Sequence, residues 1–339
     1  MVIQKVPLDR LKLPNKSVLA ILVIAFITLT GCIESEVGEG KEGITIEFKS
    51  YTVKDTIYEE ESYSVVADLR NKGRFDSPYG KVLLHGFDRN IMPFNNLEPN
   101  KNMARKSLPD LPAKTMFNPD GGYNTVEFSI PRNHIYVPYK GTYTPTLTLS
   151  TCYYYETSAA PTVCIAPKPG ELNEDSPCRP ETINMESQGA PVAITKIEQE
   201  MEDWFVNFIL TVENVGSGRV IAHTKEGYDN CPNNLGYDDL NIVKVDMNIP
   251  NMQDPVCSNE GLARLSNGKG HIFCRFQIRP DSYDEHRMEI DKDSYTQQAR
   301  IDLKYYYTTK AEQKITVAKR ESISGEVEGG SGDRPDLIN

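Results

Sequence analysis

A stretch of 17 residues occurs twice in this chain of 339 residues, and the two copies are offset by 152 positions. Gly141 to Thr157 aligns with Asp293 to Thr309, and tyrosine meets tyrosine four times, including the triplets 153–155 and 305–307. The same offset aligns two apolar pairs downstream: Val163 with Ile315, and Ile165 with Val317. We therefore predict two copies of one domain, each ending in a strand, a hairpin turn and a return strand.

Hydrophobic periodicity predicts strands along most of the chain. Apolar residues alternate with polar ones in several segments bounded by Gly, Asn, Asp and Pro, which is typical of half-buried antiparallel strands. These segments are 63–69, 126–130, 147–149, 206–212 and 272–278. Only short helical turns are expected, for example near residues 260–265. The predicted fold class is all-β: two tandem immunoglobulin-like β-sandwiches that follow an N-terminal hydrophobic signal or anchor helix.

Composition changes along the chain predict the domain limits. The Pro-rich segment 166–189 is polar and acidic, as linkers are, and the two ends carry Gly and acidic residues with little to bury. The predicted parts are a signal peptide or membrane anchor (1–31), an acidic tether (32–42), sandwich domain 1 (43–165), the linker (166–189), sandwich domain 2 (190–320) and a flexible tail (321–339).

The first 33 residues have the layout of an export signal. A basic stretch ends at Lys16 and is followed by an uncharged, largely apolar run to Ile33. Basic residues before the run also indicate a cytoplasmic amino terminus. The formal net charge is −11, and an acidic body repels phosphate backbones, so no nucleic-acid partner is expected.

The end of the apolar run suggests the anchor chemistry. Leu29-Thr30-Gly31-Cys32 resembles the lipobox of prokaryotic lipoproteins, which implies that Cys32 becomes the lipid-bearing first residue of the mature chain. Two acyl chains give stable membrane anchoring where one does not. An uncleaved transmembrane anchor and a pilin-type helix that feeds a filament remain alternatives. All three place the body on the extracytoplasmic face of the cell membrane.

Cysteine number indicates an oxidising compartment. Once Cys32 is set aside for lipid, six cysteines remain and can close three disulfides in any of 15 pairings. Through the repeat, Cys152 and Cys164 are expected to face each other across the last hairpin of copy 1. Cys257 and Cys274 flank one segment and form a second pair, which leaves Cys178 with Cys231. The spacings of zinc sites are absent.

A short motif carries a family resemblance. Leu69-Arg-Asn-Lys-Gly73 and Val212-Glu-Asn-Val-Gly-Ser-Gly218 are each a strand that ends in Asn-x-Gly. This is similar to the CARDB-like and related immunoglobulin-like domains of archaeal and bacterial surface proteins. The resemblance implies a tight turn between paired strands, for which Asn and Gly supply positive φ. It implies spacer or adhesion modules and no catalytic residues.

No enzyme signature is present, so no catalytic residue, cofactor or resident metal is expected. The Asp- and Asn-rich loop 229–239 suggests calcium, but it lacks the EF-hand spacing, and solvated turns are the simpler interpretation. Each tyrosine triplet places one face in the core. The other face packs across strands or binds a sugar or partner, although the single Trp204 argues against a sugar platform.

Two hypotheses for function follow. The first is a membrane-anchored lipoprotein whose tandem domains form a structural or adhesive module for an envelope or cell-surface protein. The second is a lipoprotein that binds a small ligand or ion, such as an accessory subunit of a transporter, for which a concave pocket is required.

Overall fold

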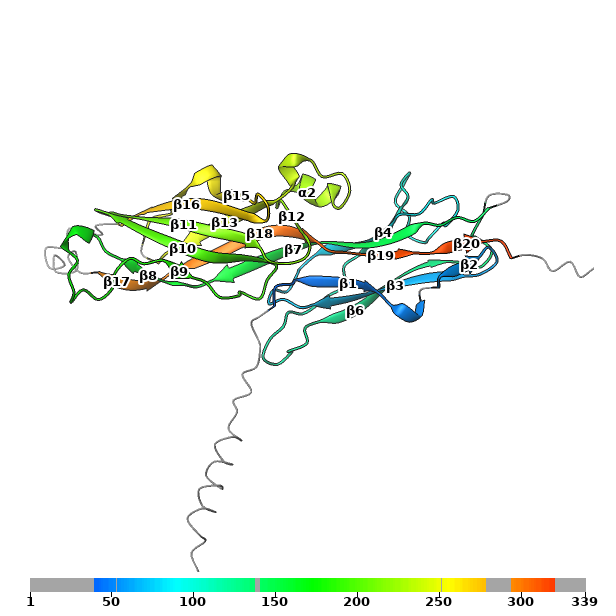
Figure 1. Ribbon diagram of the computed structural model, residues 1–339, viewed down its shortest axis with the longest axis horizontal. Helices are drawn as coiled ribbons and strands as arrows, with labels where there is room; N and C mark the ends of the chain where they lie inside the picture. The colour runs from blue at the N-terminus through cyan, green and yellow to red at the C-terminus, as the bar shows by residue number, and fades with distance from the viewer. Residues whose placement is uncertain (1–39, 53, 138–140, 251, 279–293, 321–339) are drawn as a thin grey trace, which may run out of the picture. The chain divides into compact units, whose positions relative to one another are not determined.

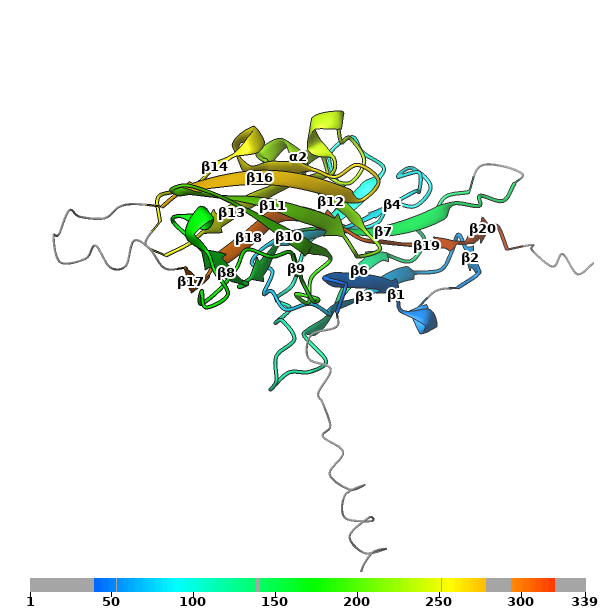
Figure 2. The same cartoon turned by 60° about the vertical axis from the view of Figure 1, so that its left-hand side comes forward.

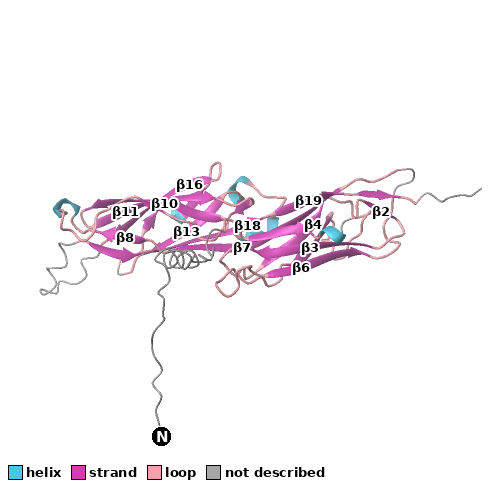
Figure 3. Ribbon diagram, turned by 60° about the horizontal axis from the view of Figure 1, so that its bottom comes forward, coloured by secondary structure: helices cyan, strands magenta, loops and turns pink. Residues whose placement is uncertain are grey.

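The computed structural model describes residues 40–52, 54–137, 141–250, 252–278 and 294–320. Strands dominate these residues (Figure 3), which confirms the all-β prediction at the level of fold class. The predicted signal or anchor (1–31), Cys32 and the tail (321–339) lie outside the described residues. Within the described part of the chain, no helix has the length and apolar character needed to cross a membrane.

The first group of strands forms a two-layer arrangement. One sheet has the order β1 (Ile44–Phe48), β3 (Tyr63–Asn71) and β6 (Tyr123–Ile130). The facing sheet contains β5 (Met103–Ser107), β4 (Gly80–His85), β7 (Thr146–Ala159) and β19 (Lys310–Lys314). Alternate residues of β3 are buried, as the sequence periodicity predicted.

The second group repeats this plan with more strands. Its outer sheet has the order β14 (Val256–Cys257), β16 (Lys269–Gln277), β11 (Phe205–Asn214), β10 (Val192–Glu202) and β9 (Ile183–Asn184). The facing strands are β15 (Leu262–Arg264), β13 (Ile242–Asn248), β12 (Arg219–Ile221) and β18 (Arg300–Thr308), joined by the end of β7. One hydrophobic core runs through both groups.

Three antiparallel pairings in one constant register, together called the ladder below, connect the two groups. Residues 146–165 pair with residues 295–314 without a change of register, from Thr146 opposite Lys314 to Ile165 opposite Tyr295. The ladder includes β8 (Thr162–Ile165), which pairs with β17 (Tyr295–Gln298). Figure 1 shows β7 and the β18–β19 path running from one group of strands into the other.

The ladder corrects the predicted hairpins. β8 does not return along β7 but pairs with β17 of the other copy, and β20 (Thr316–Ala318) pairs in parallel with β2 (Thr56–Tyr58). Each copy therefore gives its last strands to the other group. β8, at the end of the predicted sandwich domain 1 (43–165), therefore pairs with a strand of copy 2, and residues 40–320 lie within a single compact unit.

Helices are short. Helix α2 (Lys225–Asn230) begins at Thr224, whose hydroxyl accepts a hydrogen bond from the backbone N–H of Gly227. The helical turn expected at residues 260–265 is a 3-10 turn at Ser258–Gly261, followed directly by β15. The other 3-10 turns are Ser50–Thr52, Pro169–Glu171 and Tyr237–Asp239. The predicted linker 166–189 is partly regular, since β9 pairs with β10.

Candidate functional site

The core face of the ladder carries four buried tyrosines. Successive side chains of a strand point to opposite faces, so the first and third residue of each triplet enter the core. Tyr153 and Tyr155 lie opposite Tyr307 and Tyr305. The Tyr153 hydroxyl donates to the carbonyl of Ile44 at 3.2 Å, and burial raises its pKa above the ordinary value.

The Asn-x-Gly turns lie against two of these hydroxyls. Tyr307 Oη donates to Asn214 Oδ1 at 2.9 Å and accepts from the Gly218 N–H at 2.8 Å. In the first copy, a Cβ at Gly73 would lie 1.7 Å from Tyr155 Oη. Neither glycine of the motif has positive φ, so the predicted reason was wrong. Glycine is needed because a tyrosine approaches the turn closely.

The opposite face of the ladder carries an aromatic cluster formed by Tyr79, Tyr154, His223, Tyr228 and Tyr306. Tyr79 stacks on Tyr154 with ring centroids 5.5 Å apart, and its hydroxyl lies 3.0 Å from that of Tyr306. Tyr154 and Tyr306 are nearly buried, whereas Tyr79 is 42% exposed. Cross-strand packing thus accounts for the middle residue of each triplet, and Tyr79 keeps part of the cluster open to solvent.

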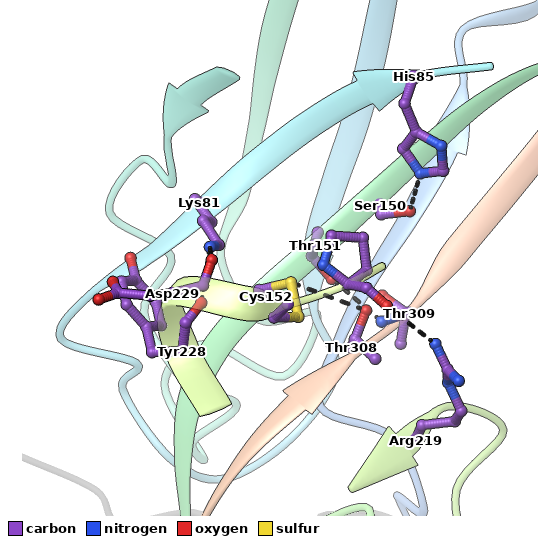
Figure 4. Close-up of a disulfide and its surroundings, with 12 residues drawn as sticks. Lys81, His85, Ser150, Thr151, Cys152, Arg219, Tyr228, Asp229, Thr308 and Thr309 are labelled. Carbon is purple, nitrogen blue, oxygen red and sulfur yellow. Dashed lines mark hydrogen bonds between the residues drawn. A yellow bond between two sulfur atoms is a disulfide. The ribbon is translucent and has the colours of Figure 1, made fainter. Parts of the chain in front are cut away.

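A disulfide between Cys152 and Cys231 fixes helix α2 beside this cluster (Figure 4). Lys81 reinforces the attachment: its Nζ donates to the carbonyl oxygens of Tyr228 at 2.6 Å and Asp229 at 3.3 Å. Lys81 is only 3% exposed, and this burial lowers its pKa to about 8. A strand of copy 1 is therefore covalently joined to a loop of copy 2.

A hollow of about 590 Å³ lies on the same face of the shared sheet. His85 and Ser150 line it from β4 and β7, with His85 Nε2 3.0 Å from Ser150 Oγ. Arg219 enters from β12 and donates to the carbonyl of Pro232 at 3.3 Å (Figure 4). Burial lowers the pKa of His85, while nearby Glu312 opposes this shift. The hollow is thus lined by an imidazole, hydroxyl groups and a guanidinium group, together with the ion pair of Lys310 and Glu312.

Two of the predicted disulfide pairings are wrong. Cys257 pairs with Cys274 as expected, but Cys152 pairs with Cys231 and Cys164 with Cys178. Cys152 and Cys164 do not face each other, because both lie on one extended path along the ladder. Cys164 instead holds the Pro-rich segment, where the Cys178 N–H also donates to Ser294 Oγ at 3.1 Å.

Two carboxylates of the acidic loop 229–239 bind groups of the protein itself. Asp239 Oδ2 accepts a hydrogen bond from the Gly236 N–H at 3.0 Å, and Asp238 forms an ion pair with Arg264 at 3.4 Å. No group of three or more metal-ligating side chains occurs among the residues that the structure describes.

Sequence reasoning missed the hollow and the attachment of α2. His85, Ser150 and Lys81 carry no motif, and only the pairing of β4 with β7 brings them to one face. The cysteine count signalled that Cys152 and Cys231 were bonded, but not to each other. A scan against protein-family models finds no match, and a search of curated proteins finds none either.

Proposed function

We propose that the chain is a membrane-anchored extracytoplasmic lipoprotein whose two immunoglobulin-like sandwiches, joined by exchanged strands, form a structural or adhesive module for another envelope or cell-surface protein. The pairing of residues 146–165 with 295–314 in one constant register carries this proposal. A shared sheet holds two sandwiches rigidly, which suits a spacer or a display scaffold. The three disulfides support an oxidising compartment.

The anchor rests on the sequence. Leu29-Thr30-Gly31-Cys32 resembles a lipobox, and modification of Cys32 would hold the body at the membrane. We expect the purified native protein to begin at Cys32 and to carry acyl chains in intact-mass measurement. The Cys32→Ala variant should keep its leader and lose the acyl mass. A native chain that retains residues 1–31 would exclude the lipid form of the proposal.

The partner is tested by crosslinking on intact cells. A photoreactive residue at Tyr79, on the open side of the aromatic cluster, is compared with one at Val256, which is also exposed. We expect a discrete crosslinked product with an envelope protein for a module that binds a partner. The absence of any product from a panel of exposed sites on both groups of strands would argue against an adhesive role.

The hollow beside His85 and Ser150 favours a second candidate, a lipoprotein that binds a small ligand. Its hydroxyl, imidazole and guanidinium groups converge on one space, as ligand sites require. Thermal unfolding of the full chain is compared with and without phosphate, sulfate, glucose and galactose. A stabilisation that Arg219→Ala abolishes would favour this second function, and unchanged melting with all four favours the first.

A further inference from the structure

The loop between β5 and β6 displays two large apolar side chains. Met116 is 79% exposed and Phe117 is 98% exposed, the highest exposed fraction of any large apolar residue in the described chain. Single exposed apolar residues are common, whereas apolar side chains exposed next to each other form a contiguous surface, the kind of feature that marks protein or membrane contacts. Figure 2 shows this teal loop projecting beyond β6.

The tip is built as a fixed turn. Thr115 and Asn118 exchange two backbone hydrogen bonds of 3.1 Å, and Thr115 Oγ1 also accepts from the N–H groups of Phe117 and Asn118. Asn118 Nδ2 donates to the carbonyl of Ala113 at 3.2 Å. The turn therefore fixes the backbone at Met116 and Phe117 with both side chains exposed, so little backbone entropy is lost when these side chains become buried.

The base of the loop lies where the described chain begins. The Lys114 N–H donates to the Gly73 carbonyl at 2.8 Å, and the Lys72 N–H donates to the Gly43 carbonyl at 2.9 Å. Asn71 joins the two segments, since its Nδ2 donates to the Leu111 carbonyl at 2.9 Å. The base of the projecting loop is thus hydrogen-bonded to the Lys72–Gly73 segment, and that segment is hydrogen-bonded to Gly43, the first residue after the predicted tether 32–42.

The tether is short. Gly40 is eight steps along the chain from Cys32, with seven residues between them, and eight fully extended steps span at most about 26 to 29 Å. A chain anchored at Cys32 therefore keeps Gly40, and the corner of the body that begins there, within that distance of the bilayer. That distance allows apolar side chains at this corner to reach the headgroup region, where apolar faces bury about 5 to 10 Å deep.

We propose that Met116 and Phe117 form a second membrane contact, in which the loop tip enters the bilayer interface beside the anchor. The inference rests on the proposed anchoring at Cys32. Two attachments close together fix the orientation of the body on the membrane, whereas one flexible tether leaves it free to rotate. The occupant is the lipid surface, because the tether brings the bilayer to this corner regardless of which proteins are nearby.

The test uses tryptophan as a depth probe in the full chain, reconstituted into phosphatidylcholine and phosphatidylglycerol vesicles. Trp204→Phe removes the native tryptophan, and Phe117→Trp or Val256→Trp then supplies one probe; Val256 is 77% exposed and serves as the matched control. We expect the Phe117→Trp probe to lose roughly half of its emission when the lipids are brominated at interfacial depth, and the Val256→Trp probe to lose little. Vesicle flotation is measured on the same samples.

The outcomes separate the two proposals. Equal, weak quenching of both probes in vesicles that carry the protein overturns the loop contact and leaves the anchor standing. Failure of the protein to float overturns both. Protection of the loop probe from iodide without quenching by brominated lipid assigns the tip to contacts between copies of the chain and also overturns the proposal. A Met116→Ser, Phe117→Ser variant should melt like the parent, because these side chains contact nothing in the fold.

Discussion

Tyr154 and Tyr306 lie opposite each other in the ladder, and they are also the same position of the two copies of the repeat. Because each of these residues pairs with its own equivalent in the other copy, a two-fold axis relates the ladder strands of the two copies at this point. The exchange of strands is therefore reciprocal: what copy 1 gives to the second group, copy 2 gives to the first. The aromatic cluster and the Cys152–Cys231 bridge both lie beside this point.

Removal of the Cys152–Cys231 bridge tests the link between the copies. The bridge closes a sequence separation of 79, and the loop-entropy relation predicts a loss of about 4 kcal/mol in the free energy of unfolding. The Cys152→Ala, Cys231→Ala variant is measured by urea denaturation. The control is Cys257→Ala, Cys274→Ala, with a separation of 17 and an expected loss of about 3 kcal/mol. A smaller loss in the first variant than in the control would contradict the prediction.

Gly73→Ala tests the close approach of Tyr155 to the first Asn-x-Gly turn. The new Cβ would lie 1.7 Å from Tyr155 Oη and 2.8 Å from the Glu42 carbonyl, so a buried ring must move. We expect a loss of about 2 to 4 kcal/mol in the free energy of unfolding. Gly170→Ala, where a Cβ meets nothing within 4 Å, is the control and should change stability little. Equal stability of the two variants would refute the interpretation.

Alkaline pH should weaken the fold through the buried tyrosines. Burial raises the pKa of Tyr153, Tyr155 and Tyr305, and raises that of Tyr307 to about 12. Because the unfolded chain ionises first, their contribution is complete below pH 10 and is lost as the pH rises from 10 towards 12. Urea unfolding across this range, followed with tyrosinate absorbance, measures it. Tyr307→Phe should reduce the alkaline loss, whereas Tyr136→Phe, at an exposed position, should not.

Lys81 should have the opposite effect on stability: its contribution to the free energy of unfolding should increase as the pH rises. Its pKa falls from 10.5 to about 8 on folding, so the folded chain releases a proton that the unfolded chain retains. The free energy of unfolding of the parent, relative to Lys81→Met, should therefore rise between pH 8 and 10.5, by about 3 kcal/mol. Denaturation of both proteins at matched pH values gives this difference. A difference that is flat with pH would show that Lys81 keeps its charge in the folded state.

The sequence was informative about elements and their equivalence. Alternation in β3, β6 and β16 predicted strands because each has one face in the core and one largely in water, and the tyrosine triplets established the repeat. Alternation and sequence repetition depend only on the order of residues along the chain, so one sequence is enough to detect them.

Pairing partners are not local, and there the predictions failed. A strand followed by Ala160 and Pro161 has the same pattern whether it turns back on itself or continues into the other copy. The misassigned cysteines follow from that one error, since Cys164 was placed opposite Cys152. The hollow near His85 and the exposed Phe117 were also invisible, because both depend on which strands and loops meet in space.

The shared ladder has a mechanical consequence. Two ordinary domains in series yield one at a time under tension, and the segment between them bends freely. Here, a load applied along the strands of residues 146–165 and 295–314 acts across their hydrogen bonds, in shear, so many bonds must break together. Such a body should withstand pulling as one element, and neither half should be recoverable as a folded fragment.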